Sequence, residues 1–383
     1  MKSVLIITPS FLPEIGGVET RFNDICNELD RRGYRVFVLT YQPLITKAHG
    51  PAYEVKGNIT IYRTSWIGFD LFHKLKPYPV LQALYLCPAL LVKAVIFLIK
   101  HHNEVDAIHT AGFNAALIGR ILRMFYKQRW VVSTHAIYDL NTKSLTARIL
   151  RWILSPADVV LTLSEPSRQE LIKIGVPSGK LINQITWVDQ DVFKPMDREE
   201  CRYKMPQKTN HQANFLVLFV GRLLEIKGVR DLAAIANSTP DIDYIFIGDG
   251  PLAAFLKAAE QFKAQNAFFL SRVENKHLPV YYNAADVFVM PSQYKEGLGR
   301  VVVESLYCGT PVIASNLGGL AGLLDESVAV MIEPTQENIK SAILGLKNDP
   351  DKLQKMRSMC REFALKKFGI VNFEVILQAY NFN

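Results

Sequence analysis

Closely spaced cysteines are missing from this sequence. Its 383 residues include five cysteines, which are far apart and form no C-x-x-C motif. This spacing argues against a disulfide framework or a cysteine zinc site and favours a reduced, intracellular compartment. A long apolar run is also missing near the N-terminus, where Val4–Ile7 is followed at once by Thr8 and two prolines. We therefore expect no signal peptide.

Strong compositional bias is absent as well. Hydrophobic residues make up 49% of the chain and charged residues 21%, while glycine (22) and proline (19) are close to average usage. Disordered, collagen-like and coiled-coil classes are therefore excluded. At about 100 to 200 residues per domain, the length predicts two domains, or three small ones.

Acidic residues are scarce in one region only. The chain carries 44 Lys and Arg against 36 Asp and Glu, and the window from His73 to Arg151 holds 11 of the basic residues and 3 of the acidic ones. The net charge of +8 therefore belongs to this window. Such a surplus attracts nucleic acid or an anionic membrane surface, or it serves solubility alone.

The first residues have the pattern of a βαβ unit. Val4–Ile7 is a short apolar run typical of a buried parallel strand, and a Pro/Gly loop through Gly17 follows it. Apolar positions then recur at helical spacing from Thr20 to Arg32, with Gly33 where a C-terminal cap is expected. Tyr34–Tyr41 is the predicted second strand.

The second half of the chain repeats this arrangement. The predicted strands are Phe215–Val220, Tyr244–Ile247, Val287–Met290 and Pro311–Ala314, and the predicted helices are 229–236, 252–263 and 301–308. The fold class is therefore α/β, with two doubly wound domains. In such sheets ligands bind at the carboxyl ends of the strands, so we expect the site in a cleft between facing domains.

We expect four segments along the chain. Residues 1–190 form an N-terminal α/β domain, 191–214 a polar linker, 215–365 a C-terminal α/β domain, and 366–383 a C-terminal helix. The linker prediction rests on the polar character of Asp189–Asn214, which shows neither a helical nor a strand period. The last segment carries an apolar stripe that needs a partner surface, formed by Phe373, Ile376, Leu377 and Tyr380.

A basic loop follows the first strand of the second half. Gly221-Arg222 and Lys227-Gly228 place two positive charges between glycines at a strand end. Arg grips phosphate oxygens in a bidentate way and Lys acts as a point charge, so the pair suits a diphosphate leaving group without a metal. A solvated pair of loop charges is the alternative.

Two glutamates follow a later strand of the same half. Glu296 lies in a loop with Gly297 and Gly299, and Glu304 lies on the first turns of the next helix, so both can face one ligand. Carboxylates there accept hydrogen bonds from sugar or ribose hydroxyls. The alternative is that each only complements the dipole at the helix N-terminus.

The first half offers less specific candidates. Gly16 and Gly17 precede a helix, where their backbone N–H groups can approach an anion, although a tight turn explains them equally well. His109 and His135 each follow a predicted strand, and a structural role is the alternative for both. The D-x-D sequences at 189–191 and 241–243 are interpreted as turns.

Two helix patterns fall in the basic window. The stretch 80–99 is almost entirely apolar, which fits a core helix, an interfacial helix or a membrane span. A second helix is predicted over 114–127. It places three basic residues on one face, which we predict to associate peripherally with an anionic membrane: Arg120, Arg123 and Lys127.

Several segments, taken in chain order, share one resemblance. They are Pro13-Glu-Ile-Gly-Gly-Val-Glu19, Ser164-Glu165 with Arg168, Val220-Gly-Arg-Leu-Leu-Glu-Ile-Lys-Gly228, Ile247-Gly-Asp-Gly-Pro251, Pro291-Ser-Gln-Tyr-Lys-Glu-Gly-Leu-Gly299 with Glu304, Cys308-Gly-Thr-Pro-Val312 and Gly318-Gly319. Together they resemble the GT-B-fold retaining glycosyltransferases of family GT4. The resemblance covers nearly the whole chain and implies two Rossmann-like domains facing across a cleft. It implies that residues 1–190 bind the acceptor and 215–365 the nucleotide sugar, and that the C-terminal helix at 366–383 returns to the N-terminal domain.

The resemblance also implies roles for individual residues. The catalytic set would be Glu296, His135, Arg222 and Lys227. Within it, Arg222 and Lys227 would hold the donor diphosphate, Glu296 the transferred sugar, and His135 would lie beside that sugar. The other donor-binding residues would be Gly16, Gly17, Arg272, Val273, Gly297, Leu298, Gly299 and Glu304, with Glu304 at the ribose. On the acceptor or membrane side we place His109, Arg120, Arg123 and Lys127.

The predicted function follows from this resemblance. It is the retaining transfer of a sugar from a nucleotide sugar, first of all a UDP-sugar, to a glycan or lipid-linked glycan acceptor, in cell-surface polysaccharide, lipopolysaccharide or glycolipid biosynthesis. We expect no metal and no further cofactor. The predicted location is cytoplasmic and peripheral at the inner face of the plasma membrane, with no nucleic-acid partner. The alternatives are a GT-B-fold nucleotide-sugar epimerase and a non-enzymatic basic binding protein.

Overall fold

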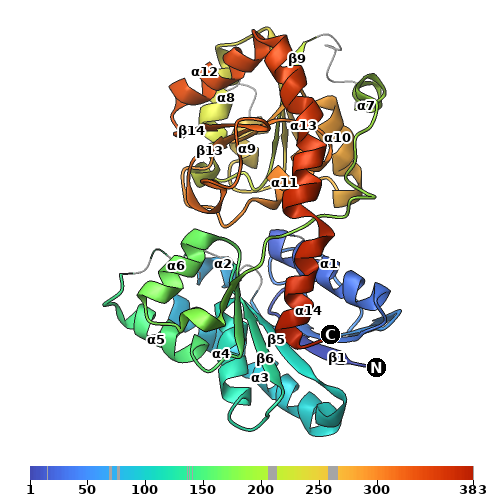
Figure 1. Cartoon of the computed structure of the whole chain (residues 1–383), viewed down its shortest axis with the longest axis vertical. Helices are drawn as coiled ribbons and strands as arrows, with labels where there is room; N and C mark the ends of the chain where they lie inside the picture. The colour runs from blue at the N-terminus through green and yellow to red at the C-terminus, as the bar shows by residue number, and fades with distance from the viewer. Residues whose placement is uncertain are drawn as a thin grey trace. The chain divides into compact units, whose positions relative to one another are not determined.

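The chain folds into two α/β units in the computed structural model (Figure 1). The structure describes residues 1–14, 16–68, 71–75, 78–135, 137, 139, 141–205, 214–257 and 266–382. The first unit comprises Met1–Thr186 and Val371–Asn383, and the second comprises Trp187–Ile370.

The first unit is built on a mostly parallel sheet. Within the described residues the sheet has eight strands in the order β3-β4-β2-β1-β5-β6-β7-β8, and only the β3–β4 pairing is antiparallel. The strands are β1 (Ser3–Ile7), β2 (Arg35–Tyr41), β3 (Tyr53–Lys56), β4 (Ile59–Thr64), β5 (Ala107–Ala111), β6 (Arg129–Ser133), β7 (Val159–Thr162) and β8 (Leu181–Asn183). The helices are α1 (Gly17–Arg31), α2 (Leu71–Lys74), α3 (Pro79–His101), α4 (Gly112–Leu122), α5 (Leu145–Leu154), α6 (Glu165–Lys173) and α14 (Glu374–Tyr380), with short 3₁₀ turns at 102–104, 178–180 and 370–373.

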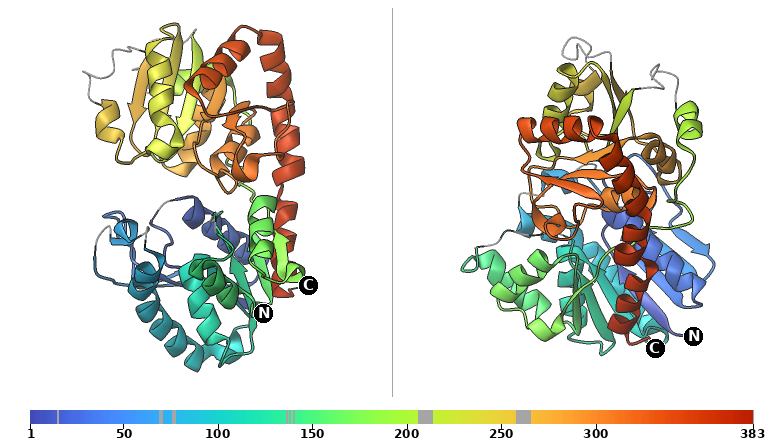
Figure 2. Two further views of the ribbon diagram at one scale, coloured as in Figure 1. Left: turned by 90° about the vertical axis from the view of Figure 1, so that its left-hand side faces the viewer. Right: turned by 45° about the horizontal axis from the view of Figure 1, so that its top comes forward.

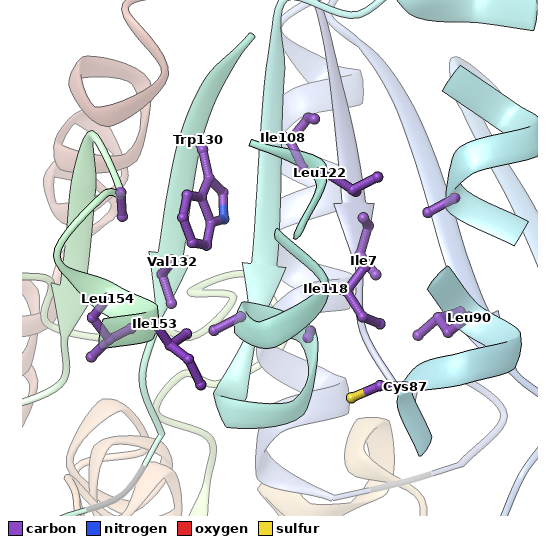
Figure 3. Packing of buried hydrophobic residues seen from close by; sticks show 14 of the residues in the cluster. Ile7, Cys87, Leu90, Ile108, Ile118, Leu122, Trp130, Val132, Ile153 and Leu154 are labelled. Atoms are coloured by element: carbon purple, nitrogen blue, oxygen red, sulfur yellow. The ribbon is translucent and has the colours of Figure 1, made fainter. Parts of the chain in front are cut away.

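Strand alternation divides the core of this unit between two faces of the sheet. Side chains such as Ile7 and Ile108 point to the face covered by α3, α4 and α5, where they pack with Leu90, Ile118 and Ile153 (Figure 3). His109, one position further along β5, points to the opposite face and contacts Phe22 of α1 and Tyr380 of α14. Helices α1 and α14 therefore cover the face that α3 to α5 leave free.

The C-terminal helix belongs to this first unit. Within the segment expected at 366–383, α14 packs beside β6, and the Arg129 guanidinium donates to the Ala379 carbonyl oxygen at 2.5 Å. The Lys2 ammonium donates to the Asn381 carbonyl oxygen at 3.0 Å, so the two chain ends lie side by side, as both views of Figure 2 show.

Helix α3 carries a proline in its interior, and a tyrosine hydroxyl bonds to backbone groups on either side of it. Pro88 lacks an N–H group, and the Tyr41 hydroxyl inserts into the backbone ladder two residues further on. It accepts the Leu90 N–H at 3.1 Å and donates to the Leu86 carbonyl oxygen at 2.6 Å. Because both groups are satisfied inside the core, the helix stays continuous through the proline.

The second unit is a smaller parallel sheet with helices on both faces. In the part of the chain that the structure describes, its six strands follow the order β11-β10-β9-β12-β13-β14. They are β9 (Phe215–Val220), β10 (Ile242–Ile247), β11 (Ala267–Leu270), β12 (Val287–Met290), β13 (Val312–Ser315) and β14 (Ala329–Ile332). The helices are α7 (Arg198–Lys204), α8 (Val229–Asn237), α9 (Ala253–Lys257), α10 (Leu278–Ala284), α11 (Arg300–Tyr307), α12 (Gln336–Lys347) and α13 (Pro350–Phe368), with 3₁₀ turns at 225–227, 275–277 and 318–320. The last part of the helix predicted over 252–263 lies outside the described residues.

The prediction of a polar linker over 191–214 is wrong for its described part, because residues from Trp187 onward belong to the second unit. Helix α7 packs against α10, with Cys201 fully buried. The Arg202 guanidinium pairs with the Asp286 carboxylate at 2.7 Å, and Arg198 pairs with the other oxygen of the same carboxylate. The segment is polar in sequence, but in the fold its two arginines pair with a buried aspartate and the segment packs on the second unit. Residues 206–213 of the predicted linker lie outside the described residues.

Candidate active site

The loop that holds Arg222 is fixed by backbone contacts at the end of β9. The Gly221 N–H donates to the Ile247 carbonyl oxygen at 3.0 Å, and the Leu223 N–H donates to the Asp249 carbonyl oxygen at 2.9 Å. A Cβ atom at Gly248 would lie 1.8 Å from the Gly221 carbonyl oxygen, so only glycine allows this approach. The exposed Arg222 side chain therefore stands on a braced loop at the carboxyl end of a central strand.

Lys227 is joined directly to the glutamate loop. Its ammonium pairs with one carboxylate oxygen of Glu296 and lies 5.0 Å from the centre of the Tyr294 ring. The two loops are also connected through the backbone, since the Gln293 N–H donates to the Ile226 carbonyl oxygen at 2.8 Å. The structure thus brings together two residues that lie far apart in sequence.

Glu296 is the centre of a hydrogen-bond network in a largely buried position. The Ser292 hydroxyl donates to the oxygen that also meets Lys227, at 2.7 Å, and the Tyr294 hydroxyl donates to the other oxygen at 2.8 Å. Burial, and then the neighbouring Glu296 carboxylate, raise the pKa of Tyr294, so its hydroxyl stays a donor. The ammonium of Lys227 and the two hydroxyl donors together hold the Glu296 carboxylate in a fixed orientation.

A glycine turn from another strand supports the Glu296 backbone. The Gly319 N–H donates to the Glu296 carbonyl oxygen at 2.7 Å. Gly318 has φ +66°, and a Cβ atom there would lie 2.3 Å from the same oxygen. Gly318 is therefore needed for the close approach of the two loops.

The glycine-rich segment after Glu296 leads into α11. Gly299 caps the helix with φ +68°, and the side chain of Leu298 is buried. Contact of Leu298 with a donor would therefore use its backbone. The N–H groups of Gly297, Leu298 and Gly299 lie at the N-terminus of the helix, which favours negative charge.

Glu304, on α11, has its own set of hydrogen-bond donors. It is 2% exposed and accepts hydrogen bonds from the Tyr282 hydroxyl at 2.9 Å, the Arg300 guanidinium at 3.0 Å and the Asn275 amide at 3.3 Å. Burial and the Glu304 charge raise the pKa of Tyr282, which keeps this hydroxyl protonated. The second glutamate is therefore as rigidly held as the first.

Arg272 and Val273 follow β11. The Arg272 side chain is exposed and that of Val273 is half-buried, and Asn275, two residues further on, reaches Glu304. The predicted nucleobase segment thus lies on the same loop as a partner of the predicted ribose residue.

In the first unit, Gly16 and Gly17 begin α1. Gly16 is the N-terminal cap residue, where a Cβ atom would lie 2.4 Å from the Glu19 carboxylate. A Cβ atom at Gly17 would meet nothing within 4 Å. The Ser10 hydroxyl holds Glu19 at 2.6 Å. The surroundings of Gly17 are thus open, as approach of a ligand to this helix terminus requires.

His135 keeps its hydrogen-bonding capacity unused. Neither ring nitrogen has a hydrogen-bond partner among the residues that the structure describes. The ring packs edge-on against Phe22, with 5.6 Å between ring centres. Burial, and then the positive charge of Arg21, hold the pKa of His135 well below its usual range. The side chain is therefore a neutral imidazole available to a ligand hydroxyl.

The prediction that His109 belongs to the acceptor or membrane side is wrong. The residue lies inside β5, with no exposed surface, and its two ring nitrogens contact the Tyr380 hydroxyl at 2.6 Å and the Ser133 hydroxyl at 2.8 Å. His109 is predicted to follow a strand, but the strand extends to Ala111 and includes it. His109 is therefore a core residue that joins α14 to the sheet.

The predicted cationic face of 114–127 is also wrong, because α4 ends at Leu122. Arg123 turns back to pair with the Asp158 carboxylate at 3.0 Å and donates to the Gln128 carbonyl oxygen at 2.9 Å. The guanidinium of Arg120 stacks on Trp152 at 4.9 Å from the ring centre. Lys127 lies in the turn before β6, so the three cations do not share one face.

The residues that orient the two glutamates were not predicted from the sequence. The hydroxyl and guanidinium donors are Ser292, Tyr294, Tyr282 and Arg300. Ser292 and Tyr294 lie within the segment that carried the resemblance, and Arg300 precedes Glu304 by one helical turn. These positions were visible in the sequence, whereas Tyr282 reaches the site from another helix and had no local signal.

The described residues were also compared with the side-chain groupings that hold metal ions in proteins. Among the described residues, no group of three or more His, Cys, Asp or Glu side chains is placed to hold a metal ion. The prediction of a metal-independent reaction remains a prediction.

Comparison with known proteins identifies the class. Sucrose-phosphate synthase from Thermosynechococcus elongatus superimposes with a TM-score of 0.82 over 100% of this chain and 98% of that one, at 21% identity. Anabaena HepE, solved in complex with UDP, gives 0.78 over 100% of both chains, also at 21% identity. The fold is therefore GT-B.

Sequence relatives give the family. Residues 16–182 match a glycosyl transferase 4-like domain and residues 202–366 match glycosyl transferases group 1, so the chain belongs to the GT4-type group 1 glycosyltransferases. It is 27% identical to the GDP-mannose-dependent alpha-(1-6)-phosphatidylinositol monomannoside mannosyltransferase of Mycolicibacterium smegmatis, over 94% of each chain. It is 25% identical to the enzyme of the same name from Mycobacterium tuberculosis, over 95% of this chain and 94% of that protein.

Proposed function

We propose that this protein is a retaining, metal-independent glycosyltransferase that moves a sugar from a nucleotide sugar to a glycan or lipid-linked glycan acceptor. The observation that carries this proposal is the cluster of Arg222, Lys227 and Glu296 at strand ends of the second unit. It combines two cations with an oriented carboxylate.

The cations suit the departing nucleoside diphosphate. Lys227 has three N–H donors, and its pairing with Glu296 leaves donors for phosphate oxygens. Arg222 stands on the braced loop next to it. Positive charge placed in advance where negative charge develops in the transition state lowers the barrier without a metal ion.

The carboxylates suit the hydroxyl groups of the donor. Glu296 is held by Lys227, Ser292 and Tyr294, so its orientation does not have to be established when the sugar binds. Glu304 is the proposed ribose contact. Its partners Tyr282 and Arg300 hold it in the same way, and Arg272 and Val273 are the proposed base contacts.

The first unit supplies the proposed acceptor side. Gly16 and Gly17 are proposed to approach the phosphate and the acceptor, and His135 the donor sugar. The acceptor oxygen enters on the face from which the diphosphate leaves, which retains the anomeric configuration. The two mycobacterial relatives, whose names contain phosphatidylinositol, support a lipid-linked acceptor. We further propose a place in cell-surface polysaccharide or glycolipid biosynthesis, on the cytoplasmic side of the membrane.

The donor is proposed to be a UDP-sugar. HepE, whose fold this chain shares, was solved with UDP and with UDP-glucose. The mycobacterial relatives are named as GDP-mannose-dependent, so GDP-mannose is the second candidate.

A donor panel tests the proposal. The purified chain is incubated with UDP-, GDP- and ADP-sugars and with lipid-linked acceptors, with and without EDTA, and products are followed by mass spectrometry and NMR. We expect acceptor-dependent release of one nucleoside diphosphate, unaffected by EDTA, and a product with the donor's anomeric configuration. Inversion, or loss of turnover in EDTA, would contradict the mechanism. Donor conversion without any acceptor would favour an epimerase.

A further inference from the structure

Helix α3 has an apolar surface on the side that faces away from its own core. One side packs inward through residues without exposed surface, among them Leu86, Leu90, Ala94 and Leu98. The other side carries large apolar residues that are each between 49 and 66% exposed: Leu81, Leu84, Val92, Ile96 and Ile99. We call these five residues the α3 stripe.

The α3 stripe is a continuous face. Its members, with the exposed Pro88 between them, follow one another at steps of three and four residues, which places them along one side of the helix. In a water-exposed helix these positions are normally polar. An uninterrupted apolar face of this length marks an interaction surface.

The neighbouring helices extend the apolar surface. Helix α4 packs against α3 and against α5, on the same face of the sheet. Met124 and Phe125, in the turn after α4, are about 70% exposed, and so is Leu145 at the start of α5. Trp152 of α5 is also exposed and lies under the Arg120 guanidinium. Apolar side chains thus reach solvent from three helices on one face.

The charges on these helices have a single sign. Helices α3, α4 and α5 contain no Asp or Glu, and their basic residues are Lys93, Lys100, Arg120, Arg148 and Arg151. A second copy of the same face would bring like charges together, which opposes self-association. An anionic lipid surface offers negative headgroups for the cations and an acyl boundary for the apolar side chains.

We propose that the α3 stripe, with Met124, Phe125 and Trp152, docks the first unit on an anionic phospholipid bilayer. The stretch Val80–Glu104 is long and apolar enough to cross a membrane, with a mean hydropathy of 2.0 over its most apolar 18 residues. However, 39% of those 18 residues are buried inside the protein. Insertion across the bilayer would remove Leu86, Leu90 and Leu98 from the core of the unit. The helix therefore lies on the membrane. This surface replaces the one predicted from Arg120, Arg123 and Lys127, and it does not depend on the proposed reaction.

Vesicle co-sedimentation of the full chain tests the apolar part. The vesicles are phosphatidylcholine with and without phosphatidylglycerol, at low and high salt. The variant Val92→Glu/Ile96→Glu changes only exposed positions and is expected to lower the partition coefficient tenfold or more. Val371→Glu is the matched control, since Val371 is 64% exposed and precedes α14, which packs on the opposite face of the sheet.

The cations are tested separately. Lys100→Gln/Arg148→Gln is expected to weaken binding about fivefold per removed charge on vesicles with phosphatidylglycerol, and little on phosphatidylcholine alone. Lys352→Gln/Lys355→Gln on α13 is the control. In the unchanged chain, Trp152 fluorescence is expected to shift to shorter wavelength with vesicles, and Trp152→Phe should remove that shift.

Several results would overturn the docking surface. They are no sedimentation of the unchanged chain at low salt, binding that Val92→Glu/Ile96→Glu leaves intact, and self-association in place of vesicle binding. Protein that stays in the vesicles after alkaline carbonate extraction would show insertion instead of docking.

Discussion

The polar groups singled out in the two units are stabilised in different ways. In the second unit these groups form ion pairs, Lys227 with Glu296 and Arg300 with Glu304. In the first unit two histidines are neutral. His109 is fully buried and His135 is half-buried, and desolvation, followed by the charge of Arg21, lowers the pKa of His109 to about 3 and holds the pKa of His135 well below its usual range. The candidate site of the second unit is thus built from charged side chains, whereas the first unit offers neutral imidazoles and an apolar outer surface.

The largest effect is expected from breaking the charged cluster. Lys227→Ala and Glu296→Gln should each lower kcat/KM about 100- to 1,000-fold, because each removes an interaction with charge or hydroxyls in the transition state. Steady-state kinetics with the donor found in the panel measures this. Circular dichroism must show an intact fold, and Lys276→Ala, a change in an exposed loop cation, is the control. Near-normal turnover in both variants would refute the site.

A smaller effect is expected at the second glutamate. Glu304→Gln keeps the shape of the side chain but removes its charge, so we expect a loss of about 10- to 100-fold in kcat/KM, expressed mainly in the KM of the donor. Initial rates over a range of donor concentrations separate the two constants. An unchanged donor KM would assign Glu304 to helix packing alone.

The neutral histidines make the first unit sensitive to acid. Because the folded-state pKa of His109 lies below its unfolded value, the unfolded chain binds more protons between about pH 6.5 and pH 3, and stability falls as the pH falls through this range. We expect His109→Gln to lose less stability than the parent chain between pH 7 and pH 4.5, by at most about 3 kcal/mol. Denaturant unfolding at several pH values measures it. Parallel pH profiles would contradict the buried neutral imidazole.

The smallest effect is expected from the hydroxyl that orients Glu296. Tyr294→Phe removes one neutral donor while Lys227 and Ser292 remain, so kcat/KM should fall about three- to tenfold. Tyr203→Phe, on an exposed side chain of α7, should have no effect. A loss as large as that of Glu296→Gln would mean that the hydroxyl itself contacts the reacting groups.

Much of the fold could be predicted from the sequence, because buried parallel strands such as Phe215–Val220 are continuous apolar runs. The charged residues of the candidate site could be predicted as well, since glycines mark the loops on which Arg222, Lys227 and Glu296 stand. The hydrogen-bond and ion-pair partners of a side chain could not be predicted. His109 and Arg202 look available in sequence, but Tyr380 and Asp286, distant along the chain, satisfy them in the core.

The prediction of a cationic face on α4 was wrong for the same reason, because a partner distant in sequence binds Arg123. A helical spacing of cations predicts one face only while the helix continues, and it ends when Arg123 caps it and turns toward Asp158. The apolar outer side of α3 was visible as composition, but only burial along the helix separates the α3 stripe from the core side.

Binding of nucleoside diphosphates by titration calorimetry tests the central claim most directly, that Arg222 and Lys227 of the second unit hold the donor diphosphate. We expect the parent chain to bind UDP, or GDP if the donor is GDP-mannose. Arg222→Ala/Lys227→Ala should weaken binding of that nucleotide at least about 100-fold, at about 1.5 to 3 kcal/mol for each charged hydrogen bond. The same nucleotide affinity in the parent and the double variant would contradict it.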